Sequence, residues 1–148
     1  MENKEDNDLF FLCSLIEYIA RKTKNTKKTV VEKLGKKNIQ KIYDLADVYH
    51  SENIEKVSDE FIELTDIQEG DYDIITRCQY RVPSFWEIAK VYRRLIMMVN
   101  PDRNKYVETT IEVLSSWIIP HIDNYNSSMY YENPSYIYAC YEEKEILP

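Results

Sequence analysis

Apolar residues recur every three or four positions along most of the chain, which is the spacing of one face of an amphipathic helix. Clear runs span residues 9–20 and 88–99. Only two glycines and five prolines are present, too few for the frequent turns of a β-sandwich or barrel. The pattern therefore predicts an all-α fold, a small bundle of about seven helices.

Four of these helices are predicted in an N-terminal segment, residues 1–66. After the first helix, Thr26 can cap a second helix, and Gly35 suits the left-handed residue that ends it. A third helix then carries apolar residues as far as Tyr49, and Ser51 is predicted to cap the fourth.

Residues 67–83 contain a glycine and a proline and show no helical period, so they are predicted to form an irregular connector, with a short extended piece at 73–80. A three-helix segment, residues 84–148, follows. The pattern is consistent with two helical halves and also with a single domain in which the halves pack together.

Local capping signals place the helices of the C-terminal segment. Ser84 and Glu87 form an S-x-x-E capping box at the start of one helix. Asp102 is predicted to cap the next helix, which runs to residue 125 with a kink at Pro120. Pro134, preceded by asparagine, is predicted to begin a last helix that ends near residue 147.

Charge changes sign along the chain, although the net charge is −7. Residues 21–42 hold nine lysines and arginines and one acid, whereas residues 43–76 hold eleven acids and one lysine. One interpretation is that solvated helix faces of opposite sign pack near each other. A second is an acidic surface that steers a basic protein partner. It would consist of Asp44, Asp47, Glu55, Asp59 and Glu63.

A third interpretation is a nucleic-acid-binding regulator, with a helix-turn-helix centred on Gly35. The lysines that would contact the nucleic acid are Lys24, Lys27, Lys28, Lys36, Lys37 and Lys41. However, the would-be recognition helix also carries Asp44 and Asp47, which would repel phosphates. Nucleic acid is therefore kept as the alternative to a protein partner.

The chain contains thirteen tyrosines, several of them close together near the C-terminus. Tyrosine offers a large contact area with a hydroxyl that tolerates water, and it is enriched at protein interfaces. We expect Tyr130, Tyr131, Tyr136 and Tyr138 to add to the partner-binding surface, although they could equally cover a small core. An aromatic platform for single-stranded nucleic acid would need lysines or arginines among the aromatic residues, and this segment has none.

Nothing in the sequence resembles a catalytic, cofactor or metal motif. His50 and His121 are the only histidines and neither has a metal-ligand spacing, while the three cysteines are far apart. We therefore expect no enzyme activity, no cofactor and no metal. No apolar run approaches the roughly 20 residues of a membrane span, and the first residues are acidic, so we expect a soluble cytoplasmic protein.

Residues 9–64 resemble a family of short bacterial helical proteins of unknown function. In that family an Ile-Glu-x-x-Ala helix precedes a Val-x-x-x-Leu helix, a tyrosine-rich helix that ends near a histidine, and an acidic helix. The matching positions here are Ile16, Glu17, Ala20, Val31, Leu34, Tyr43, Tyr49, His50, Val57, Asp59 and Phe61. Tyr49 stands where the family usually has leucine, and residues 65–148 lie outside the resemblance.

Genes of this family lie beside genes for ADP-ribosyltransferase-like proteins. The resemblance therefore implies an antitoxin-like or accessory role. Combined with the acidic segment, it predicts a non-enzymatic protein-binding module that occludes a basic surface of another protein, which is a toxin-type enzyme encoded nearby.

Overall fold

The structure is a computed structural model, and it describes residues 3–148. These residues form eight α-helices and two 3₁₀ helices, and no strand is found among them. The elements are α1 (Lys4–Thr23), α2 (Lys27–Asp44), α3 (Ala46–His50), α4 (Ile54–Thr65), α5 (Phe85–Val99), η1 (Arg103–Lys105), α6 (Tyr106–Leu114), α7 (Ile119–Asp123), η2 (Met129–Tyr131) and α8 (Pro134–Glu143). The predicted all-α bundle is confirmed.

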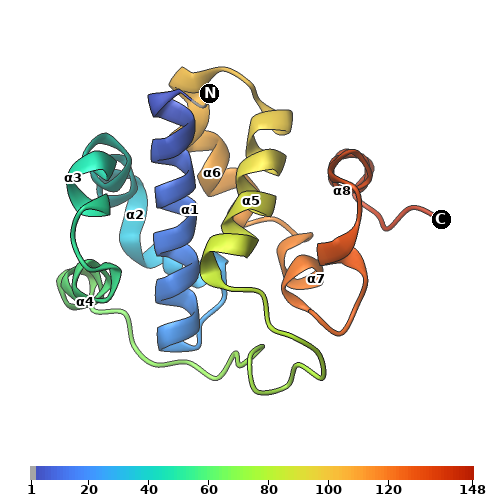
Figure 1. Cartoon of the computed structure of the whole chain (residues 1–148), viewed down its shortest axis with the longest axis horizontal. Helices are drawn as coiled ribbons and strands as arrows, with labels where there is room; N and C mark the ends of the chain where they lie inside the picture. The colour runs from blue at the N-terminus through green and yellow to red at the C-terminus, as the bar shows by residue number, and fades with distance from the viewer. Residues whose placement is uncertain (1–2) are drawn as a thin grey trace.

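Helix α1 lies at the centre of the bundle (Figure 1). It packs against α2 and α4 from the N-terminal segment and against α5 from the C-terminal segment. Leu9, Leu12, Ile16 and Ile19 have no exposed surface, because neighbouring helices cover α1 on several sides. The two predicted halves thus share one hydrophobic core.

In the N-terminal half, some predicted boundaries are correct and others are not. Thr26 caps α2 by accepting a hydrogen bond from the amide of Thr29, as predicted. Gly35 has the predicted positive φ, 75°, and its non-helical backbone separates the two helical stretches that together make up α2, as predicted. The prediction that Ser51 caps the fourth helix is wrong, because Asn53 makes that bond with the amide of Glu55.

In the C-terminal half, the capping box of Ser84 and Glu87 is present, with both reciprocal hydrogen bonds. The predicted long helix with a kink is wrong, because α6 ends at Leu114 and a turn follows. Pro120 instead lies in the first turn of α7, where its missing amide costs nothing. Pro134 begins α8 as predicted.

The connector crosses the end of the bundle without any helix or strand, so the extended piece predicted at 73–80 is not formed. It is attached to the end of α1 by two backbone hydrogen bonds, from Gly70 to Thr23 (2.8 Å) and from Tyr72 to Lys24 (2.9 Å). Asn126 holds its other part, since its amide side chain bonds the backbone of Arg77 and Gln79.

None of the helices formed by residues 3–148 combines the length and the apolar character needed to cross a bilayer.

Candidate functional site

The five predicted acidic residues lie on neighbouring elements at one end of the molecule, where Figure 1 shows α3 and α4. We call this region the acidic surface; it comprises Asp44, Asp47, Glu55, Asp59 and Glu63, all exposed. Three large apolar side chains are exposed in the same segment. They are Leu45, Val48 and Leu64, and Val48 and Leu64 are 55% and 64% exposed.

Lysines of α1 neutralise part of the acidic surface. Lys22 Nζ lies 2.5 Å from Asp59 and 3.7 Å from Glu55. The hydrogen bond to Asp59 raises the pKa of Lys22. Such exposed pairs contribute only about 0–1 kcal/mol to stability. Within residues 3–148, Asp44 and Glu63 have no basic side chain within ion-pair distance, so the surface stays negative.

The predicted tyrosines do not join the acidic surface. Tyr130 and Tyr131 belong to η2, and Tyr136 and Tyr138 belong to α8, at the opposite end of the long axis from α3 and α4 (Figure 1). Helices α1 and α5 stand between the two regions. The prediction of one combined acidic and tyrosine-rich surface is therefore wrong, because segments distant in sequence fold to opposite ends.

Two of these tyrosines have local structural roles. The hydroxyl of Tyr136 donates a 2.6 Å hydrogen bond to the carbonyl of Leu147 and so attaches the C-terminal residues to α8. Tyr138 is half-buried, and a hydrogen bond with Glu142 raises its pKa.

Tyr130 and Tyr131 instead line a groove of about 330 Å³ between α5 and the η2–α8 segment, the α5–α8 groove. Its lining residues are Glu87, Lys90, Val91, Arg94, Leu95, Tyr130, Tyr131, Glu132, Pro134 and Ile137. Sequence reasoning missed this groove because the bases that accompany the tyrosines come from a distant helix. The available signal was the spacing of four between Lys90 and Arg94, which places both on one face of α5.

The basic run does not form the patch that the nucleic-acid alternative requires. Lys27 is only 1% exposed, so its inclusion in that patch is wrong. Lys36 lies 3.3 Å from Glu108, and Lys24 lies 3.9 Å from Glu69. Lys28, Lys37 and Lys41 are exposed. A helix-turn-helix has a turn of three or four residues, whereas α2 is interrupted here by Gly35 alone.

Lys27 instead forms the centre of a buried ion-pair network. Its ammonium group lies 2.6 Å from Glu17 Oε1 and 2.6 Å from Asp123 Oδ1. Tyr92 donates a hydrogen bond to the same oxygen of Asp123, and Arg21 Nε donates to Glu17 Oε2 at 2.6 Å. Two cations thus balance two carboxylates, which is the condition under which buried charges are tolerated.

Protonation in the network follows from burial and from these contacts. Burial opposes charge on Glu17, but Lys27 and Arg21 outweigh it and lower the Glu17 pKa. For Asp123 the effect of burial is larger than the opposing effect of Lys27, and the negative charge of Glu17 adds to it, so the Asp123 pKa is raised. Burial also opposes the charge on Lys27, but Asp123 and Glu17 outweigh it and raise the Lys27 pKa.

The network lies close to the connector. A cavity of about 390 Å³ is lined by connector residues 71–74 and by Asp123 and Tyr125. Arg21 also donates a 3.2 Å hydrogen bond to the Tyr125 hydroxyl. Since the side chains of Asp123 and Tyr125 are already bonded within the network, the network serves first to join α1, α2, α5 and α7.

The two histidines pack against aromatic rings. His50 is exposed, and its ring lies 6.0 Å from Phe11 and 6.4 Å from Trp86, centroid to centroid. His121 makes an edge contact with Trp117 at 5.4 Å. Among residues 3–148, no three His, Cys, Asp or Glu side chains are arranged to hold a metal ion.

Comparison with protein-family models, with curated proteins and with solved structures finds no match to this chain.

Proposed function

We propose that this protein is a non-catalytic binding module whose acidic surface covers a basic surface of a partner protein. The observation that carries the proposal is the combination of exposed acids with exposed apolar side chains on α2, α3 and α4. Complementary charge steers the partner and fixes its orientation, whereas buried apolar contacts supply affinity.

The contacts on this surface assign separate roles to its residues. Val48 and Leu64 are the apolar anchors, because each is more than half exposed although it is large and hydrophobic. Glu63 orients the partner, because no lysine or arginine among residues 3–148 forms an ion pair with it. Asp59 contributes less, because Lys22 already balances its charge.

The resemblance of residues 9–64 supports a toxin-type enzyme, encoded by the adjacent gene, as the partner. Such an enzyme needs a basic cleft if its substrate is anionic, and an acidic module that covers the cleft would inhibit it without any chemistry of its own. The acidic segment and the resemblance cover the same part of the chain.

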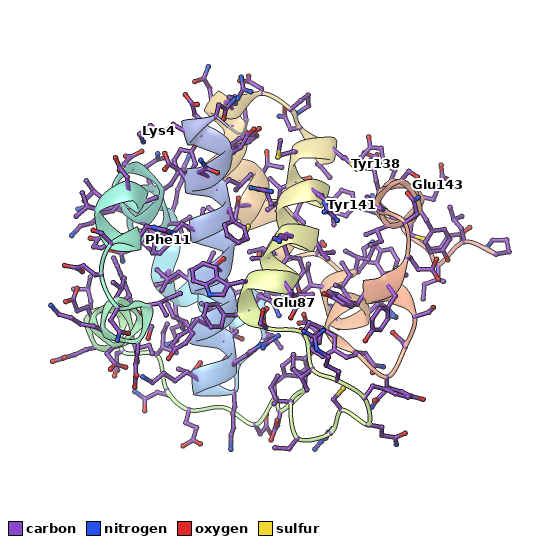
Figure 2. The ribbon with its side chains drawn as sticks, viewed as in Figure 1. Lys4, Phe11, Glu87, Tyr138, Tyr141 and Glu143 are labelled. Carbon is purple, nitrogen blue, oxygen red and sulfur yellow. The ribbon has the colours of Figure 1, made fainter. Side chains whose placement is uncertain are left out.

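The test is co-expression of the chain with the product of the adjacent gene, followed by co-purification. The wild-type chain should elute with the partner and inhibit it. The variant Glu63→Lys should weaken the complex, whereas Glu143→Lys on α8 (Figure 2) changes the same charge at the other end and should leave it intact. Two separately eluting proteins would refute the proposal.

A further inference from the structure

The α5–α8 groove contains two cations without a counter-ion. Lys90 and Arg94 are both exposed, lie one turn apart on α5 and line the groove. Neither side chain makes an ion pair or hydrogen bond with any residue between 3 and 148. By contrast, the neighbouring Glu87 is already bound by Arg81 through both of its oxygens, at 2.8 and 3.2 Å. The groove is thus locally positive in a chain of net charge −7.

Aromatic and apolar groups form the rest of the groove. Tyr130 is half-buried, and its ring makes edge contacts with Tyr125 at 5.7 Å and with Tyr131 at 4.9 Å. Tyr131 is 61% exposed, so much of its ring is open to solvent. An open aromatic face of this kind can stack against a planar group. Apolar surface comes from Val91, Leu95 and Ile137.

We propose that the α5–α8 groove binds a small molecule in which a phosphate is attached to a planar ring system, the chemistry of a nucleoside monophosphate. The phosphate lies between Lys90 and Arg94, because a guanidinium can bind two phosphate oxygens at once while an ammonium neutralises the second charge. The planar ring system stacks on Tyr131 and covers the apolar side of the groove.

The donors and the size of the groove both favour a phosphate over a carboxylate. The three terminal oxygens of a phosphate can accept hydrogen bonds from Lys90 and Arg94 at once, whereas a guanidinium alone occupies both oxygens of a carboxylate. The groove volume of about 330 Å³ is near the lower end of the range for small-molecule sites. A nucleic-acid polymer is disfavoured, since Glu142, Glu143 and Glu145 follow on α8 and the residues after it.

Calorimetric titration of the full chain tests this site with three probes: adenosine 5′-monophosphate, adenosine and inorganic phosphate. The monophosphate should bind saturably, and each of the two fragments at least about tenfold more weakly, because each makes only part of the contacts. A single-stranded oligonucleotide is the fourth arm, and it should not bind more tightly than the monophosphate.

Matched variants assign the binding to the groove. Arg94→Ala and Lys90→Ala should each weaken monophosphate binding by about tenfold or more, since each removes a charge-assisted hydrogen bond. Lys41→Ala removes an exposed lysine on α2 and should change nothing. Tyr131→Ala should weaken binding several-fold, whereas Tyr80→Ala, at a tyrosine that is 65% exposed in the connector, should not.

The proposal is overturned if the wild-type chain shows no saturable binding of the monophosphate, if Lys41→Ala weakens it as much as Arg94→Ala, or if inorganic phosphate or the oligonucleotide binds as tightly. None of these results bears on the acidic surface, because no variant used there replaces a residue that lines the groove. The failure of one proposal can therefore be distinguished from the failure of the other.

Discussion

Lys27, the first residue of α2, donates a 2.6 Å hydrogen bond to Asp123, the last residue of α7, across 96 residues of sequence. Glu17 of α1 accepts the second ion pair of the same ammonium group. Three helices from both halves of the chain therefore meet at one buried cation. This contact explains why the N-terminal and C-terminal segments form one unit.

Removing this cation should strongly destabilise the protein. Lys27→Met leaves Glu17 and Asp123 buried with too little positive charge, and breaking one partner of a buried ion pair costs about 3–5 kcal/mol. Urea denaturation should show this loss in the free energy of unfolding. Lys28→Met, at the exposed neighbouring lysine, should change it by less than about 0.5 kcal/mol. Equal effects of the two substitutions would contradict the assigned role of Lys27.

Alkaline pH should unfold the protein through the same network. The pKa of Lys27 is raised by Asp123 and Glu17 despite burial, and burial raises the pKa of Tyr92 well above 10.0. Burial likewise raises the pKa of Tyr72 to about 12. A raised pKa means that the unfolded chain loses its proton first, so this stability is present below the unfolded pKa values and is lost as pH rises above about 10.

The measurement is the free energy of unfolding from urea titrations between pH 7 and 11. It should be nearly constant to about pH 9 and then fall. Tyr92→Phe removes one of these titrating groups and should make the fall shallower, whereas Tyr80→Phe in the exposed part of the connector should leave its slope unchanged. Stability that increases above pH 10 would be incompatible with these pKa directions.

The connector should depend on Gly70. A Cβ at this position would lie 2.5 Å from the carbonyl oxygen of Lys24 and 2.3 Å from the side-chain oxygen of Asn25. The carbonyl belongs to the backbone and cannot rotate away, so Gly70→Ala should destabilise the protein by about 1–3 kcal/mol and expose the connector to proteolysis.

Gly35→Ala provides a comparison for that substitution. No atom lies within 4 Å of a Cβ at Gly35, but its φ is +75°, so the expected cost is a conformational strain of about 1–2 kcal/mol within α2. Limited proteolysis distinguishes the two, since only Gly70→Ala should accelerate cleavage in residues 67–83. Identical cleavage patterns would show that the connector is not held by the close approach at Gly70.

Features encoded by neighbouring residues could be predicted from the sequence. The capping box of Ser84 and Glu87 and the start of α8 at Pro134 depend on contacts within one turn, which the sequence displays directly. The choice of Asn53 over Ser51 as a cap could not be predicted, because both residue types suit that position; in the structure the Ser51 hydroxyl instead donates a hydrogen bond to the carbonyl of Val48.

Features that depend on tertiary contacts could not be predicted. Lys27 stands in a basic run and resembles its exposed neighbours, and its buried partners lie on α1 and α7. No lysine or arginine lies close to Tyr130 and Tyr131 in the sequence, yet the fold places Lys90 and Arg94 beside them. In both cases the local charge pattern indicated the wrong environment, because the partner residues come from distant helices.

The central claim is that the acidic surface captures a basic partner, and its most direct test is the association rate of the chain with the product of the adjacent gene at several salt concentrations. Steering by complementary charge predicts a rate that falls at least about tenfold between low and high salt. Glu63→Gln combined with Asp44→Asn should flatten that dependence. A rate that does not change with salt, or a dependence unchanged in this variant, would contradict the account.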